Sequence, residues 1–322
     1  MKQWIVRAGW IGVLAASAAV SQQPTAPAAP AAAAAPAATQ PPDVKIDTVS
    51  IAPGIYMLVG RGGNIGLTVG VDGAAIIDDQ FADMNPKIRA AVALLSDKPV
   101  SFVINTHLHG DHTGGNDAFG QSGAVIIAQE NVRKRLSVAA VNATTNQTTP
   151  PRARAALPVI TFDDSATLHF NDDDLEFTHL LNAHTDTDIM VRFRKANVVH
   201  MGDTFTGGFP FIDGGNGGTL DGFILAHEKV LPTLDDATKV IRGHGPLGNK
   251  AELQAYHDML VVVRDRIAKL VKAGKSQDDV IAARPTREFE DKYGGTSFNA
   301  AQWLGRAYVD QKTALEKRKK KK

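Results

Sequence analysis

The segment His107-Leu108-His109-Gly110-Asp111-His112 places three imidazoles and one carboxylate within six residues, and both groups are common metal ligands. In an extended segment, side chains two residues apart lie on the same side, so His107 and His109 can bind one ion together. Asp111 and His112 are adjacent and point in different directions, and Gly110 lets the backbone turn between the two pairs. The spacing therefore predicts two neighbouring metal sites.

The remaining ligands are expected downstream, because each such ion needs about four donors. His184 follows the strand-like segment 175–181, and Asp203 ends the apolar run 197–203. His244 follows another strand-like segment, 238–241, after Arg242 and Gly243. Each of the three candidates therefore lies at the end of a predicted strand.

The elements that must position these residues alternate between strand-like and helical patterns. Short strands are predicted at 44–50, 55–59, 65–71, 74–78, 100–105, 124–128, around Leu168, around Leu175, and at 189–193. Helices are predicted at 85–95, 130–140, 221–231, 250–273 and 300–316. This pattern indicates a layered α/β fold, although periodicity alone does not choose among such folds.

The two ends of the chain differ from its centre in composition. Residues 1–21 have a positive start, an apolar stretch and small residues before Gln22, as in a signal peptide for export to the periplasm or the medium. The apolar stretch is too short for a stable membrane anchor. Residues 22–42 form an Ala/Pro-rich linker, residues 43–316 are predicted to form the catalytic domain, and 317–322 form a basic tail.

Charge and cysteine content exclude several kinds of function. The formal net charge is +1, but Lys2, Arg7 and the six basic residues 317–322 contribute eight positive charges, which leaves −7 for the rest. A mildly acidic body argues against a nucleic-acid partner. The chain has no cysteine, so disulfides, thiolate ligands and cysteine nucleophiles are excluded.

The ordered set of HxHxDH, a histidine, an aspartate in a Gly-Asp pair and a final histidine resembles the metallo-β-lactamase superfamily. The resemblance spans roughly 43–247. It implies an α/β fold of the four-layer αβ/βα sandwich type, with two sheets face to face, helices outside, and a metal site in a cleft at one edge.

The resemblance also implies the ligand assignment. His107, His109 and His184 would bind one zinc ion, Asp111, His112 and His244 a second, and Asp203 would bridge them; iron or manganese also suits these ligands. Two such ions lower the pKa of a shared water towards about 7, and the resulting hydroxide would attack an acyl carbon. Asp111 would have a catalytic role in orienting the water or accepting its proton.

Other residues are assigned around this centre. Asp78, at the end of strand 74–78, is the candidate partner for a ligating histidine, with Asp79 as its competitor. Phe205, Phe209 and Phe211 are candidates for the wall of an apolar substrate pocket. Arg152 or Arg154 could pair with a substrate carboxylate, but a solvated loop is the expected setting. The other five histidines fit no ligand spacing and are expected outside the site: His169, His179, His200, His227 and His257.

These expectations favour an exported dinuclear zinc hydrolase that acts on a small cyclic or activated acyl substrate, a lactone or ester or a β-lactam. Glutathione thioesters are disfavoured, since no Lys or Arg occurs between Asp203 and Lys229. One alternative is an iron-containing oxidoreductase of the same fold, similar to persulfide dioxygenases. The other is a non-catalytic zinc-binding periplasmic protein.

Overall fold

The computed structural model describes residues 44–141, 148–295 and 299–320. The predicted signal peptide and linker lie outside these residues. Among the described residues, no helix has both the length and the hydropathy that crossing a bilayer would require.

The first half of the described chain builds one mixed sheet. Its order is β1-β2-β3-β4-β5-β6-β9, antiparallel from β1 to β4 and parallel from β4 to β9. The strands are β1 (Asp47–Ala52), β2 (Ile55–Val59), β3 (Ile65–Gly70), β4 (Gly73–Ile77), β5 (Val100–Asn105), β6 (Val125–Gln129) and β9 (Ile160–Phe162).

The second half builds another sheet of order β10-β11-β12-β13-β14-β15, in which only the β13–β14 pair is parallel. Its strands are β10 (Ser165–Phe170), β11 (Asp173–His179), β12 (Ile189–Phe193), β13 (Val198–His200), β14 (Lys239–Ile241) and β15 (Gly248–Asn249). A separate short ribbon pairs β7 (Ala140–Val141) with β8 (Thr148–Thr149).

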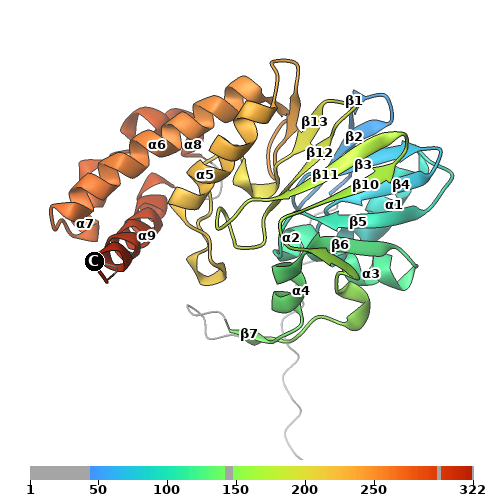
Figure 1. The fold of residues 1–322 in the computed structure, drawn as a ribbon, viewed down its shortest axis with the longest axis horizontal. Helices are drawn as coiled ribbons and strands as arrows, with labels where there is room; N and C mark the ends of the chain where they lie inside the picture. Colours follow the sequence, from blue (N-terminus) through green and yellow to red (C-terminus); the bar gives the residue numbers. More distant parts are fainter. Residues whose placement is uncertain (1–43, 142–147, 296–298, 321–322) are drawn as a thin grey trace, which may run out of the picture. The chain divides into compact units, whose positions relative to one another are not determined.

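Helices cover the outer face of each sheet, as Figure 1 shows. The outer face of the first sheet packs on α1 (Asn85–Ala93) and α3 (Asn116–Gln121), while α4 (Glu130–Leu136) packs against β6. The outer face of the second sheet carries α5 (Leu220–Val230) and α6 (Lys250–Lys272), and α9 (Ala300–Lys320) packs against these helices, with α7 (Gln277–Ala283) and α8 (Glu290–Tyr293) beside them. The remaining helix, α2 (Gly110–Thr113), lies within the histidine motif.

A cluster of buried apolar side chains lies between the two sheets. It joins Ile77 and Ile104 of the first sheet to Phe177 and Val191 of the second, and all four side chains are buried. The order of layers is therefore helix, sheet, sheet, helix, which confirms the predicted αβ/βα sandwich.

For several elements the predicted range agrees with the observed one. The ranges of β5 and β12 are identical to those predicted, and the observed α6 is one residue shorter. The last helix is longer than the predicted 300–316, because α9 continues to Lys320. The sequence pattern did not predict β9, α7 or α8, which are short and carry no sustained periodicity.

Candidate metal centre

Parallel strand pairs deliver most of the candidate ligands to one edge. β4 and β5 are parallel, and their carboxyl ends lead to Asp78 and to Thr106-His107. β13 and β14 are also parallel, and their ends lead to Asp203 and His244. His184 lies in the connection between β11 and β12. Strand ends thus position the ligands, as the sequence predicts.

The structure brings the seven predicted residues together in three overlapping groups, in each of which one ligand atom per residue lies within 4.8 Å of the others. The groups are His107-His109-His184, His107-His112-Asp203 and Asp111-His112-His244. The first and the last contain the residues that the resemblance assigns to its two ion sites.

Asp203 lies between these two sites. Its Oδ2 is 3.7 Å from Nε2 of His184, whereas its Oδ1 is 3.3 Å from Nε2 of His112 and 3.4 Å from Nε2 of His244. Gly243 permits this approach, because a Cβ there would lie 2.0 Å from Asp203 Oδ1. The two oxygens of one carboxylate therefore face different histidine groups, the geometry required of a bridging ligand.

Hydrogen bonds fix which ring nitrogen of His112, His184 and His109 faces the centre. Nδ1–H of His112 donates to Asp78 Oδ2 at 2.7 Å, and Nδ1–H of His184 donates to the Phe211 carbonyl at 2.6 Å. Nε2–H of His109 donates to Asp213 Oδ2 at 2.8 Å. Each bond leaves the lone pair of the other nitrogen directed inward, as a metal ligand requires.

Asp78 also orients His107, through Thr106. The Thr106 hydroxyl donates to Asp78 Oδ2 at 2.7 Å and therefore accepts from Nδ1–H of His107 at 3.0 Å. The Thr106 backbone N–H donates to the other Asp78 oxygen at 2.7 Å. One buried carboxylate thus supports two histidines, the role predicted for Asp78. Its competitor Asp79 instead accepts from the backbone N–H of Gly115 at 2.8 Å.

Two buried atoms test whether this residue set suits a metal. Nε2 of His107 and Oδ1 of Asp203 are buried and have no hydrogen-bond partner. Unpaired buried polar atoms are rare because each costs free energy of about 1–3 kcal/mol. Both atoms point into the cluster of lone pairs, so a cation bound there would satisfy them and the residues fit a metal centre.

Electrostatics agree with cation binding. Burial lowers the pKa of His184 to about 4 and that of His107 well below its usual value, so both are neutral imidazoles at neutral pH. Burial would raise the pKa of Asp203, but His112 and His244 hold it well below its usual range. The negative charge of Asp203 raises the pKa of His244 to about 9 against the opposing effect of burial. Divalent cations compete with protons for such sites.

Sequence reasoning missed Thr106 and Asp213. Asp213 begins the glycine-rich loop, defined here as residues 213–218, and its Oδ2 also accepts from Nδ2 of Asn216 at 2.7 Å. Asn216 is held in turn by Nη1 of Arg135 at 2.9 Å, and Arg135 pairs with Asp186. A polar network that reaches α4 thus supports His109.

A cleft of about 480 Å³ opens over the centre. Asp111 and His244 line it, with Phe81, Phe209 and Phe211 as its aromatic walls. Phe205 was predicted with them but is 1% exposed and packs edge-on against Tyr256, at 5.2 Å between ring centroids. Phe205 is therefore a core residue, since its side chain turns toward α6 instead of the cleft.

The five other histidines lie outside all three ligand groups. His200 and His227 are buried and hydrogen-bonded to backbone oxygens of Asn64 and Thr204, at 3.0 and 2.7 Å. Of the two candidate arginines, Arg152 lies near the motif, with Nη2 3.6 Å from the position of a Cβ at Gly110. Arg154 begins a short 3-10 helix.

The fold recurs in solved structures. A metallo-β-lactamase from Pontibacter korlensis shares 17% identity over 67% of this chain and 99% of its own, with a TM-score of 0.55. FIM-1 from Pseudomonas aeruginosa, in a mono-zinc form, shares 20% identity over 69% and 97%, with a TM-score of 0.54. The inverting sec-alkylsulfatase Pisa1 from Pseudomonas sp. shares 15% identity over 82% of this chain and 50% of its own, with a TM-score of 0.63.

Identities this low show a shared fold alone. No curated protein sequence matches the chain. The sequence profile described as the metallo-beta-lactamase superfamily matches residues 59–244, more than half of the chain, and this range includes all seven candidate ligands. The chain therefore belongs to the metallo-β-lactamase superfamily, whose members are mostly hydrolases.

Proposed function

We propose that this protein is an exported dinuclear zinc hydrolase that opens a small cyclic or activated acyl bond. The observation that carries the proposal is the position of Asp203, whose two carboxylate oxygens face two different histidine groups. The nitrogen and oxygen donors suit zinc and also iron or manganese.

A bound pair of metal ions supplies a Lewis acid and lowers the pKa of water from 15.7 towards about 7. The chain's own residues then define the rest of the chemistry. Asp111 lines the cleft and has a lowered pKa: burial opposes ionisation, but the hydrogen bond with His244 and the charge of His112 outweigh it. Asp111 is therefore ionised at neutral pH and can accept a proton from an attacking water.

The cleft restricts the substrate. Its volume of about 480 Å³ suits a small molecule. Phe81 and Phe211 offer apolar contacts for the acyl part, and the backbone of Gly207 and Gly208 lets a substrate approach closely. Lactones, esters and β-lactams are the substrate classes that we propose, in keeping with the β-lactamase names of two structural neighbours.

The direct test uses the purified chain and a panel of lactones, aryl esters, thioesters and cephalosporins. We expect hydrolysis of at least one lactone, ester or cephalosporin, its loss on chelation, and its return with added zinc. Bound iron with oxygen consumption and no hydrolysis would support the oxidoreductase alternative instead. A metal-loaded protein without any turnover would support a zinc-binding role. Cell fractionation tests whether the protein is exported. We expect to find it outside the cytoplasm.

A further inference from the structure

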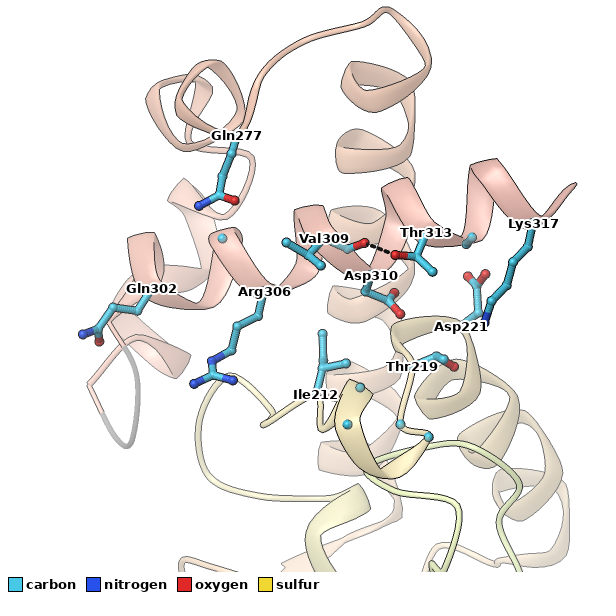
Figure 2. A pocket seen from close by; sticks show the side chains of 16 residues that line it. Ile212, Thr219, Asp221, Gln277, Gln302, Arg306, Val309, Asp310, Thr313 and Lys317 are labelled. Carbon is cyan, nitrogen blue, oxygen red and sulfur yellow. Dashed lines mark hydrogen bonds between the residues drawn. The ribbon is translucent and has the colours of Figure 1, made fainter. Parts of the chain in front are cut away.

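The two groups of metal ligands are supported by different parts of the fold. In the first group, Asp213 of the glycine-rich loop holds His109. The same loop also borders a cavity of about 860 Å³ that separates it from α9, as Figure 2 shows. The second group, Asp111-His112-His244, instead rests on the closely packed connection between β2 and β3.

His244 is the histidine ligand whose ring has the least support. Its side chain is 39% exposed, and its Nε2 lies 3.3 Å from Asp111 and 3.4 Å from Asp203. In the described part of the chain no group forms a hydrogen bond with its Nδ1, whereas Nδ1 of His112 and of His184 each has a partner. The position of His244 therefore depends on the backbone of the segment that carries it, residues 242–245.

Asn64 holds that backbone. It lies directly before β3, and its side chain is buried. Its Nδ2 donates one hydrogen to the Arg242 carbonyl at 2.9 Å and the other to the Gly245 carbonyl at 2.8 Å. Its backbone N–H donates to the Gly243 carbonyl at 2.7 Å. One residue of the first half of the chain thus makes three hydrogen bonds to the segment after β14, on both sides of His244.

The carbonyl oxygen of Asn64 connects the same segment to the turn that carries Asp203. This oxygen accepts from Nε2–H of His200, a buried imidazole, at 3.0 Å. Nδ1 of His200 accepts from the backbone N–H of Gly202 at 3.1 Å. Gly202 directly precedes Asp203 and has a left-handed φ of +50°. A chain of hydrogen bonds through Asn64 therefore joins the segment of His244 to the backbone of the bridging carboxylate.

Gly63 brings the same connection against the rest of the second group. A Cβ at Gly63 would lie 2.2 Å from Cε1 of His112, so a larger residue does not fit. Its backbone N–H donates to the Asp111 carbonyl at 3.0 Å, and its carbonyl accepts from Nε2 of Gln80 at 2.8 Å. Gly63 and Asn64 together therefore contact the histidine motif and the segment 242–245.

We infer that Asn64 is a positioning residue, which sets His244 relative to Asp203 and so forms the second ion site. Without its amide, two carbonyl groups lose their shared donor, and the segment 242–245 is free to carry His244 away from the ion. Supports of this kind change metal affinity by ~10–100-fold. The inference rests on the dinuclear centre of the proposed function, but it requires no turnover.

Two-phase zinc titration of the full chain against a chromophoric chelator tests this role. Asn64→Asp keeps the size of the side chain but removes both donated hydrogens. We expect it to weaken, by at least ~10-fold, the phase that His244→Ala abolishes, and to change the other phase by less than ~3-fold. The matched control is Asn171→Asp. Nδ2 of Asn171 also donates to two groups, in Thr68 and Gly73, but towards the opposite end of β3, so this variant should lose stability and keep both phases.

Urea unfolding of both variants is the second measurement, because a purely structural asparagine would lower stability and weaken both phases together. Equal weakening of both phases by Asn64→Asp, or parental affinity in both, overturns the inference. If Asn64→Asp does not fold, Asn64→Ser, which keeps one donor, should weaken the same phase, and parental affinity in that phase overturns the inference.

The metal content of the parent separates this inference from the proposed function. A parent that binds a single ion contradicts the dinuclear centre and overturns the inference with it. Two ions in the parent and a selective loss in Asn64→Asp, without hydrolysis of any substrate, would contradict the proposed hydrolase and leave the role of Asn64 standing.

Discussion

Nδ1 of His112 lies 2.7 Å from Oδ2 of Asp78, and both side chains are fully buried. Since the same carboxylate supports His107 through Thr106, Asp78→Asn should disturb ligands of both ion sites. We expect metal affinity to fall by ~10–100-fold, the usual cost of removing such a support. Competition with a chromophoric chelator measures this affinity. The control is Asp83→Asn, at a half-exposed position, which should keep the metal affinity of the parent. If Asp78→Asn also binds metal as tightly as the parent, His112 needs no such support.

Asp213 supports only one ligand, so its effect should be narrower. Asp213→Ala removes the acceptor for Nε2–H of His109 and frees that ring to change tautomer or rotate. We expect about 10-fold weaker binding of one of two metal ions, with the other little changed. Two-phase metal titration separates the ions. The control is Asp172→Asn, which changes an exposed carboxylate elsewhere and should bind both metal ions as the parent does. If Asp213→Ala weakens the binding of both ions equally, its role is not confined to His109.

His227 predicts a pH effect on stability. Burial lowers its pKa in the folded protein to about 4, whereas its pKa in the unfolded chain is near the ordinary 6.5. Between these values the unfolded chain binds the extra proton, so the free energy of unfolding falls as the pH decreases through this window, by roughly 3 kcal/mol in all. Above about pH 6.5 the stability contribution is fully present.

The variant His227→Gln keeps a donor for the Thr204 carbonyl oxygen but does not titrate. Urea unfolding at about pH 7 and about pH 4.5 should therefore show a smaller loss of stability for this variant than for the parent. Leu94→Gln changes an exposed residue that carries no titratable group and should keep the parental pH dependence. An identical loss of stability for the parent and for His227→Gln would contradict the lowered pKa of His227 in the folded protein.

The sequence predicted most of the strands and all seven clustered residues because these depend on local signals. β5 and β12 are short, mainly apolar segments flanked by polar residues, so the sequence indicates where each begins and ends. The histidine motif then marks one strand end, and the later ligands follow strands in the same way. Family resemblance supplied the order of layers that periodicity alone did not.

What the sequence did not show depends on long-range packing. Asp213 lies in a glycine-rich loop without periodicity, and only the fold reveals that it reaches His109. Phe205 was assigned to the substrate pocket because it follows Asp203 closely, yet Tyr256 of α6 covers it from a distant part of the chain. Thr106 could have been predicted from the sequence, since it directly precedes the histidine motif at the end of β5.

The central claim is that Asp203 joins two metal ions. Metal analysis of the purified parent should give two ions per chain, and Asp203→Ala should lower both stoichiometry and turnover, because neither histidine group keeps its shared carboxylate. Asp83→Asn, treated identically, should retain both ions. A parent that binds a single ion, or an Asp203→Ala variant with unchanged metal content and turnover, would contradict the bridged centre.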